Sequence, residues 1–342
     1  MLGNVIVGQS GGPTSVINSS LAGVFKTAKD RGANKVYGML HGIKGLLDKQ
    51  YVDLSEKIKT DIDIDLLKRT PSSYLGSCRY KLPEISDDRE TYEKIFEILR
   101  ELNISYFFYI GGNDSMDTIK KLSDYALLIG SDIKFMGVPK TIDNDLAVTD
   151  HTPGFGSAAK FIAATMKEII RDGLVYDYPT VTIVEIMGRN AGYIALWCGI
   201  ANGAEDILLP EKYDYDEQKI INNIIENRRK GKKHHIIVNA EGIGHSTSMA
   251  RRIEAATGIE TRATILGHMQ RGGSPTCKDR VYASIMGAYA VDLLLEGKTD
   301  RVVAYKNGEY VDYDIDEALS MTKTLPEYQW EIARALSYNY TK

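Results

Sequence analysis

The chain has 342 residues, enough for two domains or for one large α/β domain with an appendage. Its composition, 43% hydrophobic and 26% charged, is that of a globular protein with a sizeable core. A formal net charge of −4 argues against binding to nucleic acid or to anionic membranes. No window approaches the ~18 apolar residues that a membrane helix needs, and residues 3–8 predict a first strand where a signal peptide would need a basic and apolar start. The three cysteines are far apart and lack metal-ligand spacing, so we expect reduced thiols in a cytoplasmic protein.

Short β-rich runs alternate with longer amphipathic stretches along the chain. We expect strands over residues 5–7, 35–39, 106–110, 134–138, 181–186, 207–209, 235–239, 261–266 and 301–305. Helical spacing covers residues 16–30, 87–102, 116–128, 158–171, 191–202, 216–229 and 280–295. This alternation predicts a doubly wound α/β fold in which a second sheet domain begins near residue 140.

The residues that follow the predicted strands matter most, because open α/β sheets bind ligands at the carboxyl ends of their strands. The first strand runs into residues 9–15, QSGGPTS, and a later one into residues 111–115, GGNDS, each followed by a predicted helix. Glycines allow close backbone approach, and the amides at a helix start bind anions. Either turn could also be structural, with Asp114 serving as a helix cap. Two glycine pairs at strand ends favour a phosphate site.

The strand over residues 134–138 is followed by a lysine, a hydroxyl and two carboxylates within six residues. Because alternate residues of an extended segment share a face, Thr141, Asp143 and Asp145 can point the same way. Lys140 adds a positive charge for phosphate. Such a set suits phosphoryl transfer, which needs a base for the attacking hydroxyl and charge stabilisation for the moving group.

Later strand ends add groups that suit an anionic sugar. These are residues 187–192, MGRNAG, residues 240–242, AEG, and residues 261–273, which hold two arginines and a histidine. Arginine binds phosphate oxygens bidentately. Singly, each of these charges would be an ordinary surface residue, but together they predict a sugar-phosphate pocket.

These segments resemble the phosphofructokinase family over nearly the whole chain, with TIDND at residues 141–145 and GHMQRGGSP at residues 267–275 as the most specific matches. The resemblance implies two doubly wound three-layer α/β/α domains. Residues 1–139, with a C-terminal return over about 307–342, would bind the phosphoryl donor, and residues 140–306 would bind fructose 6-phosphate.

The resemblance also implies roles for single residues. Asp143 resembles the general base for the sugar 1-hydroxyl, and Arg189 a group that stabilises the moving phosphoryl. Arg262 resembles an arginine supplied across a subunit boundary, which implies a homodimer or homotetramer. The catalytic residues implied are Asp143, Lys140, Asp114, Thr141 and Arg189. Those implied at the sugar are Thr141, Asp143, Asp145, Met187, Gly188, Arg189, Glu241, Arg262, His268 and Arg271, and those at the donor are Gly12, Arg79, Gly112, Asp114 and Lys140.

The phosphoryl donor is expected to be pyrophosphate, with ATP as the alternative. Asp114 and Lys140 match the family's pyrophosphate pattern, since the ATP-using relatives have glycine at both positions. A carboxylate at Asp114 would repel the α-phosphate of a nucleotide, and Lys140 would supply charge for the smaller leaving group. Asn113 stands where the family has an aspartate associated with the donor's Mg²⁺, so metal ligation there is expected to be weaker or shifted.

One further departure concerns the sugar site. Thr180 stands where many relatives have a second cross-subunit arginine, which removes one expected contact to the 6-phosphate.

A catalytically inactive regulatory subunit is the alternative from another class of protein. The retained Asp143, Thr141 and Arg189 argue against it, because an inactive subunit needs no base.

Overall fold

The computed structural model describes residues 3–212 and 216–337, which fall into two compact units. Within these described ranges, the first unit comprises residues 3–142, 146–157 and 271–323, and the second comprises residues 143–145, 158–212, 216–270 and 324–337. No helix of the described ranges is both long and apolar enough to cross a membrane.

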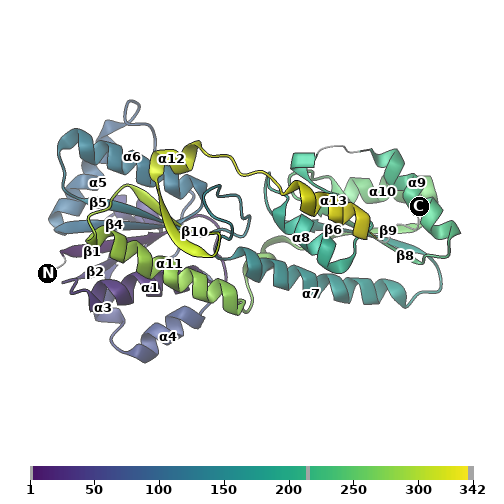
Figure 1. Cartoon of the computed structure of the whole chain (residues 1–342), viewed down its shortest axis with the longest axis horizontal. Coiled ribbons are helices and arrows are strands. Elements are labelled where there is room, and N and C mark those ends of the chain that lie inside the picture. The colour runs from purple at the N-terminus through teal and green to yellow at the C-terminus, as the bar shows by residue number, and fades with distance from the viewer. Residues whose placement is uncertain (1–2, 213–215, 338–342) are drawn as a thin grey trace. The chain divides into compact units, whose positions relative to one another are not determined.

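The first unit is built on a seven-stranded sheet (Figure 1), in the order β11-β10-β5-β4-β1-β2-β3. The strands are β1 (Asn4–Gln9), β2 (Val36–Met39), β3 (Tyr51–Asp53), β4 (Ile104–Gly111), β5 (Lys134–Pro139), β10 (Arg301–Lys306) and β11 (Glu309–Asp314). The five central strands are parallel, and the edge strands β3 and β11 are antiparallel to their neighbours. The carboxyl ends of β1, β4 and β5 are therefore adjacent.

Helices cover both faces of this sheet. They are α1 (Ile17–Asp30), α2 (Gly42–Leu47), α3 (Leu54–Lys57), α4 (Asp61–Arg69), α5 (Arg89–Glu101), α6 (Asn113–Ile129), α11 (Cys277–Leu295) and α12 (Ile315–Ser320). Successive residues of a strand enter different cores, as the pleat requires: Val5 and Val7 pack in the core beneath α1 and α11, and Ile6 packs in the core beneath α5 and α6. The unit is thus a three-layer α/β/α sandwich.

The second unit has a four-stranded parallel sheet in the order β7-β8-β6-β9. Its strands are β6 (Thr180–Ile186), β7 (Asp206–Leu208), β8 (His234–Ala240) and β9 (Glu260–Ile265). Its helical segments are α7 (Phe155–Leu174), α8 (Tyr193–Asn202), α9 (Glu217–Arg229), α10 (Ser246–Thr257), α13 (Glu327–Leu336) and the 3₁₀ turns η1 (Pro210–Lys212) and η2 (Gly267–Arg271). The helices α9 and α10 share a core with β6 and β8, whereas α8 contacts β7 and β8.

The predicted α/β fold is confirmed, and every predicted strand and helix is present within a few residues. Helix α5 is capped by Asp88, whose carboxylate accepts a hydrogen bond from the Thr91 amide at 3.1 Å. The antiparallel edge strands β3 and β11 and the helices α2, α3, α4, α10, α12 and α13 were not predicted. Strand β3 and the helices α2, α3 and α12, with three to six residues each, are too short to show the apolar period that sequence reasoning uses.

The compact units have bounds that differ from the expected division at residues 139 and 307. The chain returns to the first unit at Arg271, because β10 pairs with β5 and α11 packs closely on α1. A Cβ atom at Gly23 of α1 would lie 2.2 Å from the Ser284 carbonyl oxygen of α11, so the two helices can pack this closely only because residue 23 is glycine. The assignment of one ligand to each unit stays a prediction.

Candidate active site

In the first unit, one buried lysine joins the predicted donor turns. The Lys140 side chain is only 2% exposed, and its Nζ donates to the carbonyl oxygens of Ser10 and Gly12, both at 2.7 Å. Its own amide donates to the Gly111 carbonyl at 2.8 Å. Lys140 therefore fixes the turn after β1 against the ends of β4 and β5, and its positive charge lies under the glycine turn.

The turn after β1 needs its glycines for two physical reasons. Gly11 has a φ of +76°, in the left-handed region that favours glycine. A Cβ atom at Gly12 would lie 2.8 Å from Cζ of Arg271, so the guanidinium lies directly against this residue. Ser15 also donates to the Gly272 carbonyl at 2.9 Å. The structure thus places Arg271, predicted as a sugar-phosphate ligand, beside the predicted donor turn of the first unit.

Helix α6 begins at the second glycine pair without a side-chain cap. Gly112 is the N-cap residue and has no side chain to cap the helix, and a Cβ atom there would meet nothing closer than 3.8 Å. Asn113 and Asp114 are the first two helical residues, so Asp114 is not the cap of the helix. Its carboxylate lies 3.2 Å from Nζ of Lys81, in an ion pair with both side chains more than half exposed. The backbone amides at the start of a helix attract anions.

The loop that carries Arg79 is anchored to the turn after β1. The Gly11 amide donates to the Cys78 carbonyl at 3.0 Å, and the Ser77 hydroxyl donates to the Gly11 carbonyl at 2.5 Å. Arg79 follows directly and is exposed. The first unit therefore brings Gly12, Gly112, Asp114, Lys140 and the loop of Arg79 to adjacent strand ends, and their role at the donor stays a prediction.

The segment with the two predicted catalytic carboxylates has an alternating burial pattern. Thr141, Asp143 and Asp145 are half-buried, whereas the intervening Ile142 and Asn144 are buried. Asn144 has a φ of +55°, a conformation that asparagine tolerates better than most residues. The segment bends at residues 142–143 and is not extended as expected from sequence, so a shared side for Thr141, Asp143 and Asp145 stays a prediction.

In the second unit, Glu241 holds the turn after β6. Its Oε2 accepts hydrogen bonds from the amides of Gly188 at 3.1 Å and Arg189 at 3.0 Å. Arg189 has a φ of +52°, so this turn has a conformation that is unfavourable for arginine and depends on such contacts. The structure therefore gives Glu241, predicted as a sugar ligand, a contact that orients Arg189.

The ends of β6 and β9 are joined by Gln270. Its amide oxygen accepts from the Met187 amide at 3.0 Å, and its amide nitrogen donates to the Gly267 carbonyl at 3.0 Å. His268, between them in the sequence, is exposed. Because β6 lies between β8 and β9 in the sheet, Met187, Glu241 and His268 follow three adjacent strands.

Arg262 lies on the edge strand β9, with about half of its side chain exposed. Its guanidinium forms an ion pair with Glu260 at 2.5 Å and lies 5.7 Å from the ring centroid of Tyr176. Thr180 on β6 is buried, and its hydroxyl forms a hydrogen bond with Nδ1 of His234 at 2.7 Å. Burial lowers the pKa of His234 to about 4, so this imidazole is neutral at physiological pH.

Two buried residues that sequence reasoning missed support the predicted segments. Gln270 lay inside a recognised motif but resembled an ordinary polar residue. Asp279, at the start of α11, is fully buried and accepts from the Ser157 amide at 2.6 Å and from its hydroxyl at 2.5 Å, and it lies 2.5 Å from Nε2 of His151. From sequence, an aspartate beside a predicted helix start is expected to cap the helix, so no pattern indicated that Asp279 is the centre of a buried network.

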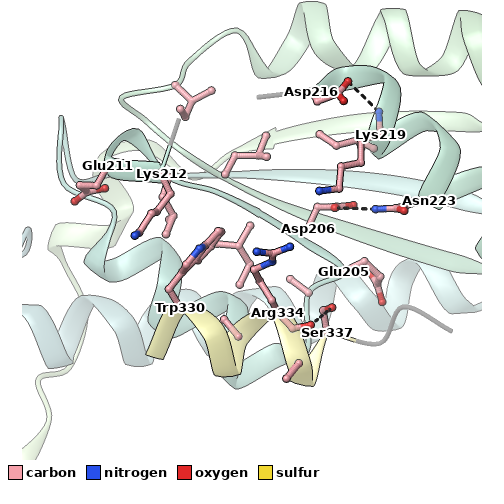
Figure 2. Close-up of a pocket in the computed structure, with 18 residues that line it drawn as sticks. Glu205, Asp206, Glu211, Lys212, Asp216, Lys219, Asn223, Trp330, Arg334 and Ser337 are labelled. Atoms are coloured by element: carbon pink, nitrogen blue, oxygen red, sulfur yellow. Dashed lines mark hydrogen bonds between the residues drawn. The ribbon is translucent and has the colours of Figure 1, made fainter. Parts of the chain in front are cut away.

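A cavity of about 780 Å³ lies in the second unit, and Figure 2 shows the side chains that line it. It is lined by β7, η1, α9 and α13, with Trp330, Arg334 and Lys219 among its side chains, and by none of the predicted site residues. Its acidic groups contact nearby parts of the chain: Asp206 bonds to His235 at 2.7 Å, and Glu211 accepts from the Gly192 amide at 2.8 Å.

Each unit is of α/β type, and its strand ends carry groups that are typical of phosphotransferases. The first has glycine turns and a buried lysine, and the second has the Arg189 turn held by Glu241 and two carboxylates. The profile of the family Phosphofructokinase matches residues 4–294. The chain therefore belongs to the phosphofructokinase family, whose members phosphorylate fructose 6-phosphate.

Similar proteins carry two different donor names. The ATP-dependent 6-phosphofructokinase of Clostridium botulinum (strain Loch Maree / Type A3) is 39% identical over 96% of this chain and 97% of its own length. The pyrophosphate-dependent phosphofructokinase of Marinobacter aquaeolei has a similar structure, with a TM-score of 0.85 and 32% identity over 96% of this chain and 86% of that one. The corresponding protein of Nitrosospira multiformis has a TM-score of 0.85 and 30% identity, over 95% of this chain and 86% of that one.

Proposed function

We propose that the chain transfers a phosphoryl group from pyrophosphate to the 1-hydroxyl of fructose 6-phosphate, reversibly, giving phosphate and fructose 1,6-bisphosphate. The observation that carries this donor assignment is Asp114, which bears the acidic side chain in the first turn of α6, at the amino end of the helix. A nucleotide bound by its terminal phosphates would bring its α-phosphate toward this negative charge. Pyrophosphate has no further phosphate to place there.

ATP is the second candidate donor, and the names of the Clostridium relatives favour it. The structure offers one feature in its favour, because Lys81 offsets part of the charge of Asp114 when no donor is bound. Lys140 argues against ATP as the donor, because the ATP-using members of the family have glycine at that position. A buried cation under the glycine turn suits a small, highly charged leaving group.

The transfer itself would use residues from the segment after β5 and from the turn after β6. The oxygen of the sugar 1-hydroxyl forms a bond to phosphorus, and the bridging P–O bond breaks and leaves its electron pair on the departing phosphate. The hydroxyl proton goes to the carboxylate of Asp143, with Thr141 and Asp145 positioning it. Arg189, oriented by Glu241, stabilises negative charge on the moving group. Met187, Gly188, Glu241, Arg262, His268 and Arg271 are the proposed sugar residues.

Mg²⁺ is the proposed metal ion. In the described ranges, no three His, Cys, Asp or Glu side chains lie close enough to hold a metal by themselves. Mg²⁺ is commonly held by one or two protein oxygens together with substrate phosphates, so such a cage is not required. The amide oxygen of Asn113, at the start of α6, fits this donor set. When bound there, the ion would neutralise charge on the donor phosphates.

A second copy of the chain would complete the sugar site by supplying Arg262, in a cytoplasmic homodimer or homotetramer. Support comes from the edge position of β9 and from the exposed apolar side chains beside Arg262, with Ile265 56% and Met269 64% exposed. Such apolar groups favour contact with another protein surface.

Mixed subunits test this shared site. Heterodimers of Asp143→Ser and Arg262→Ala chains should regain activity at one site of two, because both defects can fall in the same site. Homodimers of either variant serve as controls. If heterodimers form and show no recovery, Arg262 acts within its own chain.

A further inference from the structure

Lys81 was not among the residues predicted for the site, yet its loop is anchored on both sides. Before it, Cys78 is tied to Gly11 through its carbonyl oxygen. After it, the Leu82 side chain is 2% exposed in the core, and its carbonyl accepts from Nζ of Lys121 at 3.0 Å. The backbone of Lys81 therefore has a fixed place, although 77% of the side chain is exposed.

The ammonium group of Lys81 is available for a second partner, because its ion pair at the start of α6 is exposed. Asp114 is the single acid in the first turn of this helix, and its carboxylate forms an ion pair with Nζ of Lys81 at 3.2 Å. Exposed ion pairs are weak, because water screens them, so little holds the lysine to this carboxylate. Phosphate carries more charge and offers more acceptor oxygens than one carboxylate does, and hydrogen bonds to it are charge-assisted.

We propose that Lys81 binds the donor phosphate that becomes the leaving group, with Asp114 as its counter-ion while the site is empty. When the donor binds, the Lys81 ammonium moves from Asp114 to the phosphate, and the negative charge of Asp114 is then no longer neutralised. The same exchange would strengthen the binding of pyrophosphate and would repel the additional phosphate of a nucleotide. This inference rests on the proposed function, because it concerns the donor's phosphates.

A double-mutant cycle separates donor binding from simple neutralisation of Asp114. Lys81→Ala should raise KM for pyrophosphate about tenfold or more, the usual loss for a charge-assisted contact, and change KM for fructose 6-phosphate less than about twofold. The effect should persist in an Asp114→Asn background. Lys81→Arg should restore most of the affinity. Lys26→Ala, which breaks an exposed ion pair with Asp30 on α1, is the matched control and should change neither KM.

Two results would overturn the proposal. One is an unchanged KM for pyrophosphate in Lys81→Ala. The other is an effect that disappears when Asp114 is Asn, which would make Lys81 a counter-ion only. Calorimetric titration with Mg²⁺-pyrophosphate measures the same contact without turnover. This measurement separates the inference from the proposed function. If the wild-type protein binds pyrophosphate but turns over only ATP, the proposed function is refuted. Weaker pyrophosphate binding by Lys81→Ala than by the wild-type protein would still support the inference.

Discussion

Replacing Lys140 by Met tests whether one buried charge both braces the donor turn and serves the donor. Met keeps most of the apolar volume, so the change removes mainly the ammonium group. Two charge-assisted hydrogen bonds of 2.7 Å are lost, at about 1.5–3 kcal/mol each, or about 3–6 kcal/mol together. Burying the ammonium costs several kcal/mol, which Met does not incur. The net loss in the free energy of unfolding should therefore be about 1–3 kcal/mol.

Activity should fall far more than stability. With the carbonyls of Ser10 and Gly12 no longer held and the charge removed, kcat/KM for the donor should drop about 10²–10³-fold, the cost typical of losing one preorganised electrostatic group. The assays are thermal unfolding and initial rates at varied donor concentration. Lys323→Met is the control, because that lysine also donates to a backbone carbonyl of the first unit, at 2.7 Å from Thr149. An unchanged kcat/KM for the donor in Lys140→Met would refute the reasoning.

Three further changes test other parts of the account. Asp114→Gly should admit ATP to a measurable degree and weaken use of pyrophosphate, and unchanged ATP binding by calorimetry would contradict the charge argument. Asp143→Ser should lower kcat by about 10²–10⁴-fold while KM for fructose 6-phosphate stays within a few fold, whereas lost sugar binding with retained kcat would assign Asp143 to recognition. The pKa of His234 is depressed by burial to about 4, so the unfolded state takes up a proton first as pH falls, and stability is lost below about pH 6.5. This loss should reach about 2 kcal/mol at pH 5, measured by denaturant unfolding at pH 7 and pH 5, and it should be absent in His234→Gln; equal losses in the two proteins would count against it.

The strand ends could be predicted from sequence because they join two strong signals. A run of β-branched and apolar residues marks each central strand, and glycine or charge follows it, as at Gly11 and at Lys140. Parallel strands then bring these turns to one edge of the sheet. The edge strands β3 and β11 lack this signal because they are half exposed and bear mixed side chains.

The contacts of single side chains could not be predicted. Nothing in the sequence shows that the Lys140 ammonium lies under the glycine turn, or that Glu241 accepts from the Arg189 amide. Both depend on the register of strands far apart in the chain. Lys81 was missed for the same reason, since one lysine in a loop is most often a surface charge until its partner is known.

The phosphoryl donor is tested most directly by initial rates with fructose 6-phosphate and either Mg²⁺-pyrophosphate or Mg²⁺-ATP, measured side by side on one wild-type preparation. We expect kcat/KM for pyrophosphate to exceed that for ATP by far, because Asp114 repels a third phosphate and Lys140 suits a small leaving group. Comparable or better efficiency with ATP would contradict the proposed donor.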